Sequence, residues 1–405
     1  MKSRPRIRDL GYSPGRFKTG KTNSLLDVEG VAVGQKTIHE GQDIHTGVTV
    51  ILPRGIEKTR LLPCYAATHD LNGMGEMTGT HGLTEWGFIS APIALTNTVS
   101  VGKVYDALFL WQLEQGALAG DDEEQIMRRV SIPVVAETFD GLLNDISASV
   151  VDKQVVYDAI EASKTQTEIL EGNYGGGTAM RCHGYKGGTG TSSRIVPGAD
   201  KDYTLGVLVQ ANHGQKDDLR IGNVPVGEFL LREEAKVRAA SKKEETQFPK
   251  GGKAAEGIPM RRYSHTNCDG LRSTRGWASH KSGYRIESAI INVNCWQVGG
   301  HAAGRNFSGE IFLALSTGTS PNELATSSSG FDYLPPLETQ QVETLKNEVI
   351  DSLFYATSEA TEEAILNSMC RAEPLTGFKG RAQPALPVDR VKELLDKYMV
   401  KFEDA

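Results

Sequence analysis

Two polar residues open an apolar run in the last quarter of the chain. The run FSGEIFLALST covers residues 307–317, and its length and composition predict a strand. Because alternate residues of a strand face the same side, Ser308 and Glu310 would share one face. A hydroxyl and a carboxylate in one pocket can orient and polarise a reacting group. The alternative is an ordinary solvated strand start, which uses the same residue types.

Two further apolar runs end in polar side chains. The segment AETFDG places Glu137 and Asp140 at a strand end, where a carboxylate can hold a cationic group such as an amine. For Asp140, capping of a turn is the favoured interpretation. The segment LVQANHG ends in Asn212, whose amide can donate to a developing oxyanion or form an Asx-turn.

The glycine-dense segment at residues 172–194 suggests a phosphate cradle, but it matches neither common nucleotide-binding pattern. Close backbone packing and tight turns are the simpler interpretation. Cys182 and His183 are neighbours there, whereas His69, His81 and His213 lie far away in the sequence. No metal-ligand spacing emerges, so we expect neither a metal nor a cofactor.

The elements that must position these residues alternate along the chain. Strand-length apolar runs start near residues 47, 92, 132, 203 and 310, and helix-period segments start near residues 100, 153 and 341. This alternation predicts a mixed α/β layered fold. Its 405 residues suffice for one large domain or for two.

Composition excludes several classes of function. The net charge of −7 offers no broad basic surface for nucleic acid or for an anionic membrane. No apolar run reaches the roughly 18 residues that a membrane helix needs. The five cysteines are scattered and odd in number, which fits reduced thiols. We therefore expect a cytoplasmic protein without nucleic-acid or membrane partners.

Taken together, these segments resemble one family. The blocks GVTVILPRG, NGMGEMTGTHGLTEWG, PVVAETFDGLLND, GNYGGGTAMRCHGYKGGTGTSSR, GVLVQANHG and SGEIFLALST occur in the order found in the L-aminopeptidase/D-amidase-esterase family, which includes the β-peptidyl aminopeptidases. The resemblance implies an αββα sandwich of the N-terminal-nucleophile-hydrolase type, formed as a single large domain. It also implies a precursor that cuts itself to expose a Ser as a new N-terminus, and a homo-oligomer.

The resemblance also implies roles for the residues described above. Asn212 would donate to the oxyanion, Ser308 and Glu310 would orient and polarise the nucleophile, and Glu137 would bind the free amine of a small peptide, amide or ester. Where this chain has Phe139, the family usually has Tyr, so one hydroxyl of the site is lost. The freed α-amine of the nucleophilic Ser would serve as its general base.

One segment departs from the family pattern. Residues 20–257 correspond to the family's α chain and end in a charged linker at 232–257, and residues 298–405 correspond to the remainder of the β chain. Between them, the family has a nucleophilic Ser that begins an apolar strand. Here Gly257 is followed by IPMRRYSHTNC, which contains neither that Ser nor an apolar strand.

A shift of reading frame explains this departure. Reading the third base of each codon with the first two bases of the next, from Pro259 onward, permits the family's block D-A-P-L-L-P-H-Q-L. We therefore hypothesise that residues 258–297 combine a frameshift with a short retained intron. The chain as written would then lose a central strand and show poor folding, no self-cleavage and no activity.

Three alternatives stay open. Ser288 is a fallback nucleophile if the chain is correct as written. A catalytically dead paralogue that acts as a binding protein is another, and its transcript would encode this segment unchanged. An acyl transferase is the third, because water and an amine compete for one acyl-enzyme.

Overall fold

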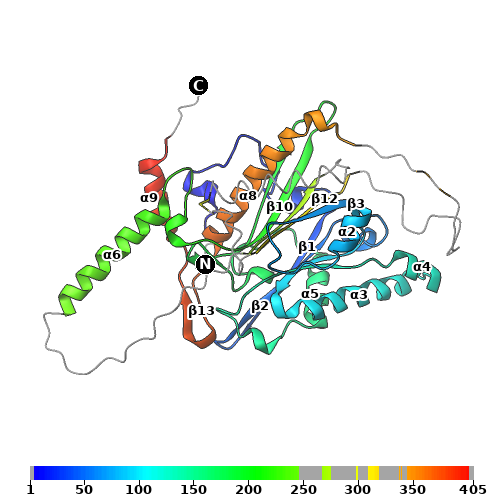
Figure 1. The fold of residues 1–405 in the computed structure, drawn as a ribbon, viewed down its shortest axis with the longest axis horizontal. Coiled ribbons are helices and arrows are strands. Elements are labelled where there is room, and N and C mark those ends of the chain that lie inside the picture. Colours follow the sequence, from blue (N-terminus) through cyan, green and yellow to red (C-terminus); the bar gives the residue numbers. More distant parts are fainter. Residues whose placement is uncertain are drawn as a thin grey trace.

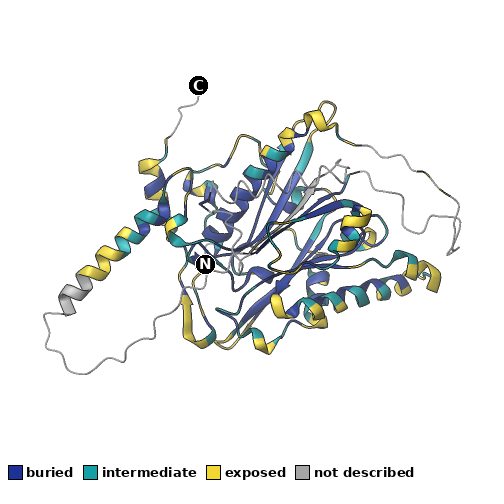
Figure 2. Ribbon diagram, in the orientation of Figure 1, coloured by how far each residue is buried: buried dark blue, intermediate teal, exposed yellow. Residues whose placement is uncertain are grey.

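The computed structural model describes residues 4–245, 267–274, 298–299, 309–318, 337, 339 and 344–400. Two sheets lie face to face in this part of the chain, and helices cover their outer sides (Figure 1). Most strand residues whose burial is described, and the inner sides of the helices, are buried, whereas exposed residues follow the outer sides of the helices (Figure 2).

The first sheet has four strands in the order β1-β2-β5-β6. These strands are Ala32–Glu40, Ile44–Leu52, Ile93–Asn97 and Val134–Thr138. Helices α3 (Val101–Leu118) and α5 (Lys153–Ala162) pack on its outer face. A Cβ added at Gly34 would lie 1.8 Å from the Ala159 carbonyl oxygen, so the glycine allows α5 to approach the sheet closely.

The second sheet has six strands in the order β4-β3-β12-β11-β10-β9. In that order the strands are Phe88–Ile89, Cys64–Asp70, Gly309–Ser316, Asn267–Thr274, Tyr203–Asn212 and Gly188–Val196. Helix α8 (Asp351–Arg371) packs against β9 and β10. Gly190 permits this contact, since its added Cβ would meet the Ala364 carbonyl oxygen at 1.9 Å.

Alternation along the strands builds three hydrophobic layers. Ile51 and Leu95 of the first sheet and Leu208 and Leu313 of the second share the layer between the sheets. Odd-numbered residues of β10, such as Val207, instead join the layer beneath α8. The order helix, sheet, sheet, helix confirms the αββα sandwich that the sequence resemblance implies.

Further helices and short strands surround this frame. Among the described helices, none combines the length and hydropathy that a membrane-spanning helix requires. The remaining helices and short strands are α1 (Gly55–Lys58), α2 (Thr80–Trp86), α4 (Glu123–Arg129), α6 (Val226–Glu245), α9 (Val388–Tyr398), β7 (Arg181–Cys182), β8 (Tyr185–Lys186), β13 (Leu375–Gly377) and β14 (Arg381–Gln383).

Two sequence predictions need correction. Residues 232–245 of the predicted charged linker form the second part of helix α6, and residues 246–257 lie outside the described part. The prediction that the chain loses a central strand is also wrong. Residues Asn267–Thr274 form β11, which pairs antiparallel with β10 and parallel with β12. The backbone N–H and C=O groups of this segment pair with those of two neighbouring strands, although its composition does not favour a strand.

Candidate active site

The ends of three strands define the site. Asn212 ends β10, and its partner in register on β11 is Asn267, which in turn pairs with Gly309 at the start of β12. Strand β6, which carries Glu137, belongs to the other sheet. A contact from Asn212 to the residue just beyond β6 brings the two sheets together at this end of the sandwich.

Asn212 is held by hydrogen bonds on both sides of its amide. Its Oδ1 accepts from the Arg181 backbone N–H at 3.0 Å, and its Nδ2 donates to the Phe139 carbonyl at 3.0 Å. The side chain is buried. An amide nitrogen carries two N–H groups, so Nδ2 has a second donor beyond this bond, as an oxyanion donor requires.

Glu137 is a buried carboxylate at the second-last position of strand β6, two residues before Phe139. Its Oε2 accepts a hydrogen bond from the Thr98 hydroxyl. Burial raises the pKa of Glu137, against hydrogen bonds from the Thr98 hydroxyl and the Glu76 backbone that lower it, and the Glu76 charge adds a smaller raising effect. A substrate ammonium beside this carboxylate would favour its charged form, so the position suits an amine.

Phe139 brings its backbone, but no hydroxyl, to the site. Its carbonyl accepts the Asn212 bond, and its ring lies against Gly141, where an added Cβ would come within 2.6 Å of ring carbon Cζ. The next residue, Asp140, is buried and accepts hydrogen bonds from Thr46 Oγ1 at 2.8 Å and from Asn144 Nδ2 at 3.0 Å. These bonds join Asp140 to strand β2 and to Asn144 through side chains, whereas the sequence interpretation favoured capping of a turn.

Glu310 lies two strands away from Asn212 and on the opposite face of its sheet. It is in register with residue 268 of β11 and Ala211 of β10, one position away from the row that contains Asn212. Burial raises the pKa of Glu310 to about 7. Among the described residues, its Oε2 has no hydrogen-bond partner. The structure thus joins Asn212 to Phe139, two residues after Glu137, but it shows no contact between Glu310 and these residues.

Two predicted site residues are not tested. Ser308 and Ser288 lie outside the described residues, as does the segment that follows Gly257. Their predicted roles therefore stay predictions. Thr98 and Arg181, which hold the two candidate side chains Glu137 and Asn212, were not identified from the sequence, because both contacts depend on tertiary structure.

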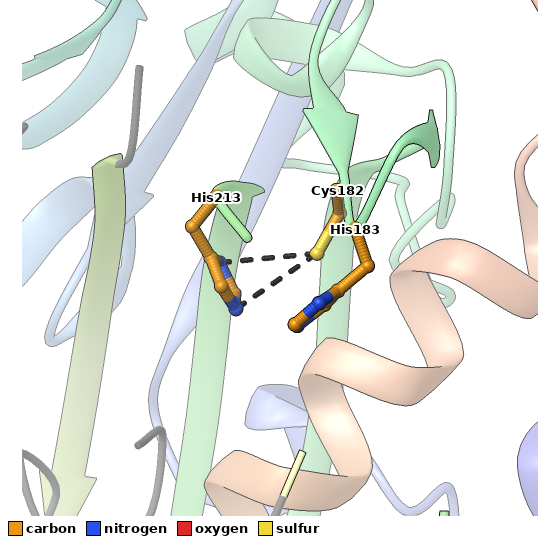
Figure 3. Close-up of side chains that lie close together, drawn as sticks. All are labelled: Cys182, His183 and His213. Carbon is orange, nitrogen blue, oxygen red and sulfur yellow. Dashed lines mark hydrogen bonds between the residues drawn. The ribbon is translucent and has the colours of Figure 1, made fainter. Parts of the chain in front are cut away.

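A second cluster lies directly beside Asn212. The side chains of Cys182, His183 and His213 converge, and one ligand atom from each lies within 4.8 Å of the others (Figure 3). All three residues are buried. The sequence separation of 30 residues between His183 and His213 hid this cluster, since only the ends of β7 and β10 bring them together.

Comparison with known proteins identifies relatives over nearly the whole chain. The model of peptidase family S58 matches residues 23–283 and 292–383. The β-peptidyl aminopeptidase BapA of Sphingosinicella microcystinivorans is 36% identical over 97% of this chain and 92% of its own length. The BapA of Sphingosinicella xenopeptidilytica is 33% identical, over 96% of this chain and 91% of its own length.

Solved structures show the same likeness. A β-aminopeptidase from a Burkholderia species superposes with a TM-score of 0.79 and 35% identity, over 98% of this chain and all of the other. The L-aminopeptidase D-Ala-esterase/amidase of Ochrobactrum anthropi gives a TM-score of 0.79 and 33% identity, over 97% of this chain and 99% of the other. That protein is described as a serine aminopeptidase with a variant of the Ntn hydrolase fold.

Proposed function

Because the chain belongs to peptidase family S58, we propose that its gene encodes a self-processing serine aminopeptidase or amidase. It releases N-terminal residues from small peptides, amides or esters. The observation that carries the proposal is the Asn212 Nδ2 contact with the Phe139 carbonyl. This contact joins the proposed oxyanion donor of one sheet to the segment of the other sheet that carries Glu137, the proposed amine-binding carboxylate, two residues before Phe139.

The proposed chemistry uses an acyl-enzyme. A Ser hydroxyl attacks the substrate carbonyl carbon and passes its proton to the α-amine of the same residue. The tetrahedral oxyanion accepts a hydrogen bond from Asn212. When the intermediate collapses, the leaving amine or alcohol takes that proton. Water then attacks the resulting ester and releases the free acid and the Ser hydroxyl.

The location of β11 supports a place for the nucleophile. The strand begins at Asn267, between the Asn212 end of β10 and Gly309 of β12. In the restored protein, the strand that the Ser begins would take this central position, with the Ser at the end beside Asn212. Asn212 would then act from one face and Glu310, with Ser308, from the other.

The chain as written lacks this nucleophile, so the proposal includes its inactivity. Gly257 is followed by Ile258 instead of Ser. Our hypothesis remains that residues 258–297 are read in a shifted frame and include a short retained intron. The corrected family position would carry a Ser at the start of the central strand, followed by the D-A-P-L-L-P-H-Q-L block.

The test begins with the spliced transcript across the codons for residues 240–310. A frame that restores the Ser supports the proposal. The restored protein and the chain as written are then expressed side by side. We expect two chains on a denaturing gel and turnover of aminoacyl nitroanilides, with both α- and β-amino acids in the panel, for the restored protein alone.

A different result would point elsewhere. A transcript that encodes EGIPMRRYSHTNC, together with a chain that neither cleaves itself nor turns over any substrate, favours a catalytically dead paralogue. Self-cleavage and turnover by the chain as written would contradict its proposed inactivity and turn attention to Ser288.

We also propose a cytoplasmic homo-oligomer. Among the described cysteines, Cys64, Cys182 and Cys370 are free and buried, which suits a reducing compartment. The oligomer rests on the family resemblance, and sedimentation velocity of the restored protein tests it directly.

A further inference from the structure

The Cys182, His183 and His213 cluster lies on the other side of β10 from the Asn212 contacts. Asn212 and His213 are consecutive, and alternation at the strand end turns them to opposite faces. Cys182 belongs to the hydrophobic layer beneath α8. The cluster therefore lies on the opposite face from Asn212, on the face to which Glu310 belongs, and the proposed chemistry gives none of its three residues a role.

An uncommon backbone conformation at His183 lets the side chains of the consecutive residues Cys182 and His183 converge. His183 takes φ +46°, in the left-handed region that few non-glycine residues adopt. Its backbone N–H donates to the His213 carbonyl at 2.6 Å, which ties the turn after β7 to the end of β10. The structure thus maintains an uncommon conformation where these three side chains meet (Figure 3).

Gly214 leaves room for one of the rings. A Cβ added at this glycine would lie 2.4 Å from Nδ1 of His183. The imidazole therefore lies directly against the Gly214 backbone. Any side chain at this position would therefore displace the ring. Gly214 also has φ +81°, which is a second reason why glycine fits here.

The donor atoms lie close to the spacing that a tetrahedral ion needs, since one from each residue lies within 4.8 Å of the others. Sγ of Cys182 lies 3.8 Å from Nδ1 and 3.9 Å from Nε2 of His213. An ion with bonds of about 2.3 Å to sulfur and about 2.0 Å to nitrogen separates such ligands by roughly 3.5 Å. Because Sγ is almost equally far from the two nitrogens of His213, ligation requires this ring to turn one nitrogen toward the ion as the three side chains close on it.

The hydrogen bonding of His183 prepares it as a ligand. Its Nδ1 lies 3.0 Å from the Gln215 carbonyl oxygen, and a carbonyl only accepts, so Nδ1 carries the proton. Nε2 then holds the lone pair. A ligating imidazole that donates its other N–H to a carbonyl is the usual arrangement in metal sites.

We propose that Cys182, His183 and His213 form a buried site for a soft transition-metal ion, with Zn²⁺ as the preferred occupant. One sulfur and two imidazole nitrogens suit such ions, whereas Mg²⁺ and Ca²⁺ prefer oxygen. On binding, the Cys182 thiol loses its proton to solvent and the thiolate takes its place as ligand. The ion joins the turn after β7 to the end of β10.

The site has a structural consequence for Asn212. Arg181, whose backbone N–H holds the Asn212 amide, precedes Cys182, and His213 follows Asn212. An ion that links Cys182 to His213 therefore fixes the two segments that orient the oxyanion donor. It also stabilises the folded chain, because the unfolded chain has no such site.

The test uses the full chain and Co²⁺ as a spectroscopic substitute for Zn²⁺. Thiolate ligation produces a sulfur-to-cobalt charge-transfer band, and Zn²⁺ should displace the Co²⁺ and remove it. We expect one ion per chain and a higher melting temperature when it is bound. Cys182→Ser should abolish the band and weaken binding by at least about ten-fold, whereas Cys370→Ser, at an equally buried thiol, should keep both.

A measurement on the unmodified chain removes any dependence on the folding of the variants. X-ray absorption of the Co²⁺-loaded protein should show one sulfur and two imidazole nitrogens around the ion. The proposal is overturned by a folded chain that binds no Co²⁺, by a coordination shell without sulfur, or by a charge-transfer band that persists in Cys182→Ser. None of these readouts requires peptidase activity.

Discussion

Strands β11 and β12 are parallel neighbours of equal length at the centre of the second sheet, yet their sequences differ sharply. Residues Gly309–Ser316 read GEIFLALS and are buried throughout. Residues Asn267–Thr274 read NCDGLRST, which contains a single large aliphatic residue. One strand is specified by its own composition, whereas the other follows from the two strands beside it.

The physical reason is that the ladder is made by backbone groups. Each residue of β11 offers an N–H and a C=O whatever its side chain, and β10 and β12 both present unpaired partners. β-Propensity spans only about 1 kcal/mol per residue and changes with context. A gap between two formed strands can therefore recruit a segment that composition alone would not identify.

The largest expected effect follows from removing a core side chain of β12. Leu313 lies in the layer between the sheets and is 1% exposed. Leu313→Ala should lower the free energy of unfolding by about 2–5 kcal/mol, because it removes buried methyl groups and leaves a cavity. Urea denaturation measures the change. Leu118→Ala, at an 81% exposed position, is the control, and an equal loss in both variants would contradict the assignment of Leu313 to the core.

The next prediction concerns the residue opposite the start of β11. In the restored enzyme, Asn212→Asp keeps an oxygen for the Arg181 N–H but loses the Nδ2 donor. We expect kcat to fall by about 10²–10³-fold, or roughly 2.7–4 kcal/mol in the activation barrier. Asn173→Ala should leave kcat unchanged. An unaltered kcat in Asn212→Asp would remove this residue from the oxyanion role.

A third prediction uses the carboxylate at the start of β12. Burial raises the pKa of Glu310 to about 7, above its usual 4.5, so the folded state binds the proton more tightly than the unfolded state. Stability from this group is full below about pH 4.5 and is lost as pH rises through about 7, by up to about 3 kcal/mol. Denaturant midpoints at pH 5 and pH 8 should show the loss. Glu310→Gln should flatten this difference.

The smallest expected effect tests β11 directly. If residues 267–274 pair on both sides, their amide hydrogens should exchange at least about 100-fold more slowly than those of an unstructured peptide, which corresponds to about 2.7 kcal/mol of opening free energy. Mass spectrometry of the chain as written measures this. If the amides of β11 exchange as fast as those of the exposed helix end near Leu118, the pairing of β11 with β10 and β12 is contradicted.

The sequence predicted most of the strands and helices that form the sandwich, but fewer of the contacts between them. The runs near residues 203 and 310 predicted β10 and β12, because apolar strand-length segments bounded by turn residues are informative by themselves. The helix expected from residue 341 is described from Asp351 in α8. The helix expected from near residue 100 begins at Val101 in α3, directly after a 3₁₀ helix at Thr98–Ser100 whose N-cap is Asn97.

The site was predicted unevenly for a related reason. Asn212 and Glu137 were identified at strand ends by residue type and by family resemblance, and Phe139 by the resemblance alone. The structure joins Asn212 to the Phe139 carbonyl, two residues after Glu137. The expected absence of a metal site was drawn from spacing, which cannot report that the ends of β7 and β10 meet. The opposite faces of Asn212 and Glu310 depend on register across three strands, which no local pattern contains.

The sequence by itself determined the alternation of strands and helices, the αββα class and the chemical identity of the candidate residues. These properties are local, since periodicity and residue type act over a few positions. Only the tertiary structure decided that a polar segment completes the central sheet and that Cys182 and His183 meet His213. Both outcomes depend on backbone pairing between distant segments, and pairing is chosen by the neighbouring strands as well as by the segment itself.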